Sequence, residues 1–203
     1  MNFFTLLVAV LVSAVFVNNF ILVQFLGICP FLGVSKKTSS AFGMGMAVTV
    51  VMVLATLVTY PLYQFVLVPL NIAYLEIIFF IFVIAALVQM LEKILQKFIP
   101  SLYSTMGIYL PLITTNCAIL GVAELVIDEA QMLKALGIAS MNLGVALLYA
   151  VFAGLGFTLA IVIMSGLREK MDKLRLPKAI AGAPITMIAA CFMAMAFYVF
   201  TLI

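Results

Sequence analysis

The stretch Cys-Pro-Phe-Leu-Gly-Val at Cys29–Val34 returns as Cys-Ala-Ile-Leu-Gly-Val at Cys117–Val122, 88 positions further along the chain. Each copy lies inside a long run of uncharged residues, in a chain that is 67% hydrophobic. The repeated element therefore indicates a duplication in which two thiols stand at matching points.

The composition places this chain in a lipid bilayer. Charged residues make up 8% of its 203 residues, it has no His and no Trp, and its mean hydropathy is +1.38. A soluble domain needs far more polar surface. No basic segment or small-residue cleavage site precedes Asn18, which predicts a retained span rather than a signal peptide. We expect one transmembrane domain over residues 1–203 and no nucleic-acid partner.

Six uncharged runs predict an all-α integral membrane protein with six transmembrane helices, because crossing the hydrocarbon takes about 20 apolar residues. Glu76 is expected at the entrance of the third helix, and Pro61 and Pro69 are expected to bracket the connection before it. The predicted helices lie near 3–34, 40–60, 71–92, 102–126, 135–166 and 179–202.

The Lys and Arg residues predict the orientation. Nine of them follow the first, third and fifth spans, and only Lys134 falls on the opposite side. The nine are Lys36, Lys37, Lys93, Lys97, Arg168, Lys170, Lys173, Arg175 and Lys178. By the positive-inside rule they face the cytoplasm, so both termini lie outside a bacterial or archaeal cytoplasmic (inner) membrane.

Three spans per half is an odd number, so the two copies of the cysteine element cross the membrane in opposite directions. The predicted fold is therefore a 3+3 inverted repeat, with halves at about 1–97 and 98–203. Helices 1 and 4 are expected to be broken at the midplane, because a helix over residues 1–35 would be about 50 Å long against a core of about 30 Å.

Polar and helix-breaking residues gather at both expected breaks. They are Asn18, Asn19, Gln24, Gly27 and Pro30 around Cys29, and Gly107, Pro111, Thr114, Thr115 and Asn116 before Cys117. Backbone groups freed by a break must be satisfied within protein. Paired interruptions in corresponding spans point to a site at the midplane.

Several interpretations of the thiols remain open. A lone Cys in a membrane helix is most simply a small apolar residue, and we interpret Cys191 in that way. A disulfide between Cys29 and Cys117 is possible but would not explain the polar residues around both. Zinc usually needs four ligands, and the chain has no His and no CxxC. An iron–sulfur cluster fits if a second subunit supplies two more thiolates.

The segments Val17–Lys37 and Gly107–Ala118 closely resemble the A-subunit family of the Rnf electron-transport complexes, and the resemblance covers essentially the whole chain. A nearby family is the E subunit of the sodium-pumping NADH:quinone oxidoreductase, from which Asn18-Asn19 and Cys29-Pro30-Phe31 distinguish this chain. Cys191 stands where the Rnf A-subunit family usually has small residues.

The resemblance implies a membrane component of an ion-translocating ferredoxin:NAD⁺ oxidoreductase. It implies that Cys29 and Cys117 bind a [2Fe–2S] cluster shared with the paralogous E subunit, which supplies two more Cys. The B, C, D and G subunits, with flavins and further Fe–S clusters, would complete a complex that couples electron flow to Na⁺ or H⁺ transport. Asn19, Thr115 and Asn116 are candidates for hydrogen bonds to the cluster or to the broken backbone.

The sequence also contains two membrane-associated carboxylates and a set of small residues, and it leaves one other class of function open. Glu76 and Glu124 are interpreted as interfacial carboxylates rather than an ion pathway. Small residues at 43–47, with Gly144, Gly154 and Gly156, predict close helix contact within this chain or with a partner. An inverted-repeat secondary transporter without a redox cofactor would explain the topology equally well, but not the paired thiols.

Overall fold

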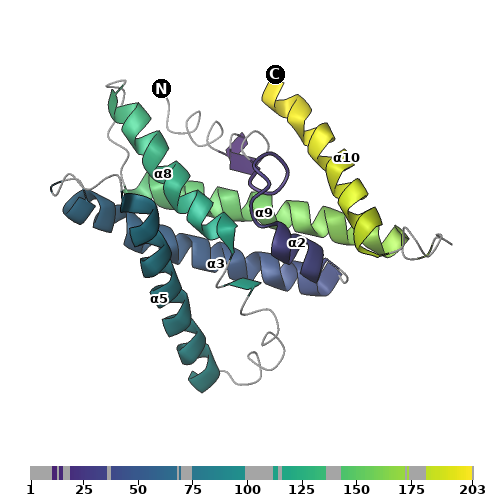
Figure 1. Cartoon of the computed structure of the whole chain (residues 1–203), viewed down its shortest axis with the longest axis horizontal. Helices are drawn as coiled ribbons and strands as arrows, with labels where there is room; N and C mark the ends of the chain where they lie inside the picture. The colour runs from purple at the N-terminus through teal and green to yellow at the C-terminus, as the bar shows by residue number, and fades with distance from the viewer. Residues whose placement is uncertain are drawn as a thin grey trace. The chain divides into compact units, whose positions relative to one another are not determined.

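The computed structural model describes residues 11–12, 14–15, 19–35, 38–67, 69, 75–98, 112–113, 116–135, 143–171, 173 and 182–202 (Figure 1). Every regular element in these ranges is a helix. Within the described residues, three helices are long and apolar enough to cross a membrane: Thr38–Leu67, Glu76–Ile94 and Leu143–Met171. The fold is thus all-helical with several candidate spans, as the sequence predicts.

The first of these spans contains a proline. Helix α3 covers Thr38–Leu62 with Pro61 inside it, and the chain continues as the π-helix η2 over Tyr63–Leu67. Proline lacks the amide that a helix needs and its ring crowds the preceding turn, and a wider π-turn accommodates both effects. The expectation that Pro61 lies in a connection after the helix is therefore wrong.

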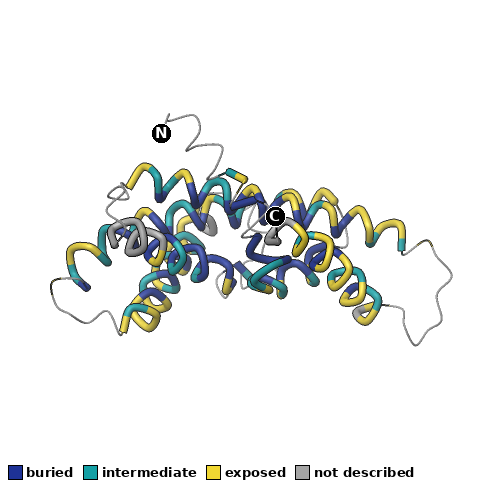
Figure 2. Tube along the Cα trace, turned by 90° about the horizontal axis from the view of Figure 1, so that it is seen from above, coloured by how far each residue is buried: buried dark blue, intermediate teal, exposed yellow. Residues whose placement is uncertain are grey.

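Helices α5 and α9 differ in how deeply they are buried. Only 17% of the apolar window of α5 (Glu76–Phe98) is buried, against 56% for α9 (Leu143–Met171). Glu76 lies at the entrance of α5, as expected, as the first residue of the helix, while the predicted start near Asn71 lies outside the described residues. Helix α9 therefore supplies much of the core, and α5 leaves most of its apolar surface for lipid or another protein (Figure 2).

Three further helices complete the described chain: α2 (Ile28–Val34), α8 (Cys117–Ala135) and α10 (Ala183–Leu202). Helix α8 ends nine residues after the predicted boundary at 126, so Lys134 is part of a helix rather than of a loop. Charged residues end a membrane-embedded apolar segment, but they do not by themselves end a helix.

The chain divides into two compact units. The first contains Met1–Thr49 and Phe152–Ile203, and the second contains Val50–Val151. In the first, α2 packs against α10; in the second, α5 packs against α8, and the rings of Tyr63 and Phe80 meet edge to face with their centroids 6.4 Å apart. Helices α3 and α9 each contribute one part to each unit.

Two glycine–threonine pairs bring α3 and α9 together in the first unit. A Cβ at Gly45 would lie 2.6 Å from Oγ1 of Thr158, and a Cβ at Gly154 would lie 2.5 Å from Cγ2 of Thr49. Each Thr hydroxyl donates to a carbonyl of its own helix, Thr49 to Gly45 at 2.8 Å and Thr158 to Gly154 at 2.8 Å. Each helix thus contributes one Gly and one Thr, which confirms the predicted close approach within this chain for Gly45 and Gly154, whereas a Cβ at Gly144 would meet nothing within 4 Å.

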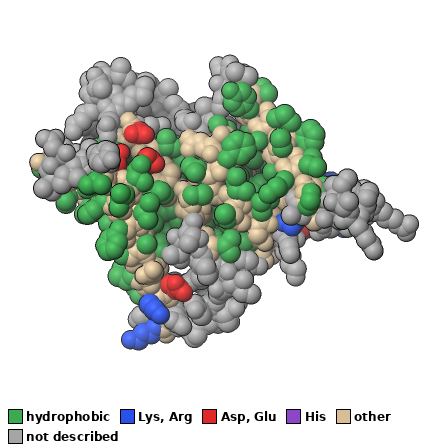
Figure 3. Space-filling model, in the orientation of Figure 1, with side chains coloured by type: hydrophobic (Ala, Val, Ile, Leu, Met, Phe, Trp, Pro, Cys, Tyr) green, Lys and Arg blue, Asp and Glu red, His purple; other side chains and the backbone are tan. Residues whose placement is uncertain are grey.

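Among the described residues, many hydrophobic side chains lie on the face shown in Figure 3. Large apolar side chains are exposed along α5 and α10, among them Ile78, Phe82, Met187 and Phe192. Exposed apolar area of this extent is typical of surfaces that face lipid or a partner protein.

Candidate functional site

The Cys29 segment belongs to the first unit and is not one continuous helix. Residues 20–24 and 26–27 form turns and a bend before α2 begins at Ile28. Phe25 and Gly27 have positive φ angles of 57° and 79°. Gly27 is the N-cap of α2, where a left-handed conformation costs a glycine little. A break therefore precedes Cys29, which is exposed in the first turn of α2.

Asn19 holds the backbone at this break. Its Nδ2 donates to the carbonyl oxygens of Val15 at 3.0 Å and Gly156 at 3.2 Å. Its Oδ1 accepts from the amides of Ile21 at 3.2 Å and Leu22 at 3.3 Å. The side chain is fully buried and its hydrogen-bonding groups serve backbone atoms. Asn19 therefore satisfies the broken helix, one of the two roles that the sequence allows.

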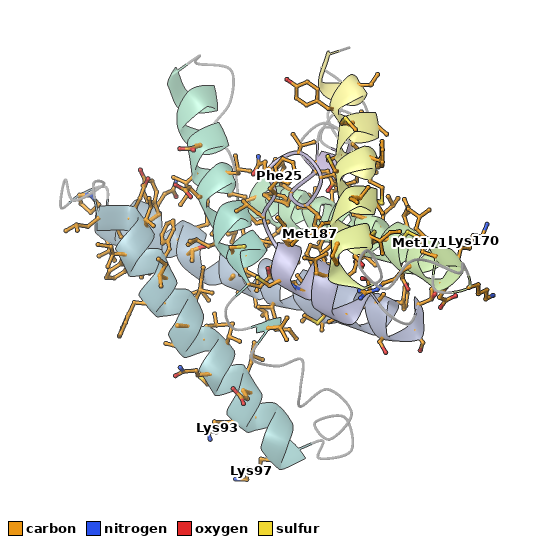
Figure 4. The ribbon with its side chains drawn as sticks, turned by 45° about the vertical axis from the view of Figure 1, so that its right-hand side comes forward. Phe25, Lys93, Lys97, Lys170, Met171 and Met187 are labelled. Atoms are coloured by element: carbon orange, nitrogen blue, oxygen red, sulfur yellow. The ribbon has the colours of Figure 1, made fainter. Side chains whose placement is uncertain are left out.

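The other end of the Cys29 segment contacts the end of α9. Arg168 Nη1 donates to the carbonyl oxygen of Leu32 at 2.7 Å and to Oγ of Ser35 at 3.1 Å. Glu169 Oε1 accepts from the amide and the hydroxyl of Thr38, at 3.3 and 2.7 Å. These contacts join the connection between α2 and α3 to the end of α9, where Figure 4 labels Lys170 and Met171.

The Cys117 segment belongs to the second unit and starts differently. Asn116 is not helical, and its Oδ1 accepts from the amide of Ala118 at 3.1 Å. This is the hydrogen bond of a helix N-cap. Cys117 follows as the first residue of α8 and is exposed. Its predicted neighbours Gly107, Pro111, Thr114 and Thr115 lie outside the described residues.

The side-chain amide of Asn116 also has an unused hydrogen-bond donor among the described residues. Its side chain is 5% exposed, and its Nδ2 is buried without a hydrogen-bond partner in the described part of the chain. A buried amide group left unpaired is costly, so a native chain usually provides it with an acceptor. The sulfur atoms of a metal–thiolate centre are acceptors of this kind.

The three cysteines of the chain form no disulfide, and all three are exposed. Cys191 lies on α10 with its side chain exposed, rather than packed in a core. No group of three His, Cys or acidic side chains in the described ranges could hold a metal ion. A chain with three Cys cannot supply four thiolates alone. Cys29 and Cys117 are each an accessible thiol near the start of a helix, so either could serve as a metal ligand.

Three carboxylates approach one another in the second unit. Glu124 and Asp128 act electrostatically on Glu76, whose Oε2 is buried without a hydrogen-bond partner among the described residues. The sequence pattern pointed to Glu76 and Glu124 but not to Asp128, which follows Glu124 by one helical turn. It also indicated only an orientation signal at Arg168, because a contact 136 residues away leaves no local pattern.

These features define a multi-span helical membrane protein with paired, accessible thiols at helix starts. The family model described as "Rnf-Nqr subunit, membrane protein" matches residues 7–203, and the chain belongs to that family. It is 50% identical over 195 residues to the A subunit of the Na(+)-translocating ferredoxin:NAD(+) oxidoreductase complex of Acetobacterium woodii, covering 96% of each chain.

Two further relatives agree with this assignment. The A subunit of the ion-translocating oxidoreductase complex of Syntrophotalea carbinolica is 49% identical over 191 residues, 94% of each chain. The protein of the same name from Azoarcus sp. is 48% identical over 187 residues, 92% of each chain.

Proposed function

We propose that this chain is the A-type membrane component of an ion-translocating ferredoxin:NAD⁺ oxidoreductase. The observation that supports it is the 50% identity, over almost the full length, to the A subunit of the Na(+)-translocating ferredoxin:NAD(+) oxidoreductase complex of Acetobacterium woodii. In this proposal the chain is not catalytic alone. It works with a paralogous E-type partner and with the B, C, D and G subunits in the cytoplasmic membrane.

Within the complex, Cys29 and Cys117 are proposed to ligate a [2Fe–2S] cluster, with two Cys of the paralogous partner completing the set. When bound, the cluster would accept and release one electron at a time between a cytoplasmic donor and an outer flavin. The chain would place its two thiols at helix starts, and Asn116 Nδ2 would be available to donate toward a sulfur atom.

The helix N-terminus of α8 also favours this role for Cys117. The aligned peptide dipoles give the start of a helix a partial positive charge, which favours anionic groups bound there. The negative charge of a thiolate-bound cluster would benefit in the same way.

The inverted repeat belongs to the same proposal. The first unit combines the Cys29 segment with parts of α3 and α9 and with α10; the second combines the Cys117 helix with the other parts and with α5. If each helix of the first repeat corresponds to the helix at the same place in the second repeat, the elements of the first unit correspond to those of the second unit. The breaks near Cys29 and Cys117 are proposed to lie at the membrane midplane, with both termini outside.

The transporter alternative predicts a colourless protein, because it gives the paired thiols no cofactor. Purified chain with its paralogue should instead contain iron and acid-labile sulfide, and after reduction it should give the electron paramagnetic resonance signal of a [2Fe–2S] cluster. A preparation of the assembled pair without iron would overturn the cluster proposal and leave only the family assignment.

A second test asks whether electrons pass through the site of the two thiols. We predict that Cys29→Ala or Cys117→Ala, in an assembled complex, leaves the cytoplasmic clusters reducible by ferredoxin while the outer flavin stays oxidised. The physical reason is distance, since the two faces are separated by about 30 Å of hydrocarbon. Stopped-flow spectroscopy of flavin reduction measures this, with Cys191→Ala as the matched control.

Subunit composition must be intact before the kinetics are compared. Cys191→Ala should reduce the outer flavin at the unmodified rate and translocate ions normally. Flavin reduction at that same rate in Cys29→Ala or Cys117→Ala would exclude these thiols from the path.

A further inference from the structure

Helix α2, which carries Cys29, has few means of holding its own position. It has seven residues, and isolated helices shorter than about 12 residues are marginal in water. Its N-cap is Gly27, which provides no side-chain hydrogen bond, whereas Asn116 caps the helix of Cys117. The position of α2 therefore depends on contacts with other elements.

Arg168 provides the polar part of those contacts. The carbonyl of Leu32 is among the last four of α2, which accept no hydrogen bond from within the helix. Arg168 Nη1 donates to this carbonyl at 2.7 Å, and also to the buried Ser35 that ends the helix. A guanidinium at this end supplies a charge-assisted hydrogen bond and a favourable charge for the helix dipole.

Cys29 is three residues from Leu32, a rise of about 4.5 Å and less than one helical turn. Residues this close in a helix move together, so a displacement at the Leu32 carbonyl also moves the thiol. Arg168 is itself held in place, because it belongs to α9, the most buried of the three candidate spans.

We propose that Arg168 is a positioning residue for Cys29. Its hydrogen bonds to Leu32 and Ser35 hold α2 so that the thiol keeps the orientation in which a partner protein can complete the site. The proposal rests on the proposed function only where it treats Cys29 as a cluster ligand; the restraint on α2 is a property of this chain.

The test uses the purified, assembled complex. Arg168→Gln removes the charge and shortens the donor, Arg168→Lys retains the charge, and Lys170→Gln removes an equal charge two residues away on an exposed side chain. The first readout, taken after an iron chelator has removed the cluster so that both thiols can react, is the rate of maleimide modification of Cys29, with Cys117 in the same molecule as the internal reference. The second is the resonance signal and midpoint potential of the reduced cluster.

Losing a charge-assisted hydrogen bond should raise the modification rate of Cys29 relative to Cys117 by roughly tenfold or more in Arg168→Gln. Arg168→Lys should restore part of the difference, and Lys170→Gln should match the unmodified complex. The cluster signal should broaden or shift in Arg168→Gln and recover partly in Arg168→Lys.

An unchanged ratio in Arg168→Gln, or an equal increase at both thiols, would overturn the positioning role. If Arg168→Gln does not assemble, Ser35→Ala removes one of the two acceptors at no cost in charge, and it should raise the ratio in the same direction. A complex with no cluster signal before any substitution contradicts the proposed function, yet the modification ratio still decides the role of Arg168.

Discussion

Asn19 and Asn116 carry the same side chain near matching cysteines, but they have different surroundings. Asn19 uses both its donor and its acceptor on backbone atoms, including the distant carbonyl of Gly156. Asn116 uses its acceptor to cap α8 and keeps a buried donor without a partner among the described residues. Asn19 is therefore a structural residue, and Asn116 is the better candidate for contact with a cluster.

Asn19→Ala should lower the free energy of unfolding by about 2–4 kcal/mol, because buried carbonyl and amide groups would lose their partners. Denaturant unfolding of the chain in mixed micelles measures this. Gln24→Ala is the control, since the half-buried Gln24 makes no side-chain hydrogen bond in the described ranges. Equal losses in the two variants would show that the Asn19 hydrogen bonds add nothing.

Among the helices, the contact between α3 and α9 depends on the absence of two side chains. Gly45 and Gly154 each face a Thr whose Cβ would lie within 3 Å of an added methyl group. Threonine is branched at Cβ and has few rotamers, so it cannot move aside easily. The helices themselves would have to separate.

We therefore expect Gly45→Ala to destabilise the chain by about 1–3 kcal/mol through overpacking. The matched control is Gly166→Ala in α9, where an added Cβ meets nothing within 4 Å. That variant should be neutral or slightly more stable, because Ala favours helix more than Gly does. Thermal unfolding of both variants in the same detergent gives the comparison, and a Gly45→Ala protein as stable as Gly166→Ala would contradict the close contact.

For the molecule as a whole, the predicted orientation in the membrane rests on nine basic residues expected on one side against one on the other. Lys93 and Lys97 are exposed at the end of α5, where Figure 4 labels them. Lys36, Lys37, Arg175 and Lys178 lie outside the described residues. Among the basic side chains that the structure describes, Arg168 differs because it is half-buried and hydrogen-bonded to α2 and Ser35.

Reporter fusions after Lys97 and within residues 168–178 should report the cytoplasm, and fusions at Ile203 and near Lys134 should report the outside. Alkaline phosphatase and green fluorescent protein fusions give opposite signals on the two sides and so control for each other. With the fusion after Lys97 in the cytoplasm, a cytoplasmic C-terminus would contradict both the orientation and the inverted repeat, because three further spans place the C-terminus outside.

Local signals in the sequence were enough to show that the chain belongs in a lipid bilayer, that it is helical, and which family it resembles. Apolar runs of membrane length and the low charge require a bilayer, whatever the tertiary arrangement. The two hexapeptides identified both thiols, and Gly27 and Pro30 indicated the break at Cys29. Each of these signals depends on residues that are neighbours in the chain.

The distant partners of the polar residues that hold the break could be identified only from the tertiary structure. The Asn19–Gly156 and Arg168–Leu32 hydrogen bonds join residues more than 130 positions apart, so no spacing in the sequence could reveal them. The same holds for the partners of Gly45 and Gly154, and for Asp128 beside Glu76. Hydrophobicity places helices in a membrane, but close packing and hydrogen bonds between distant residues decide how the cysteine-bearing segments are held.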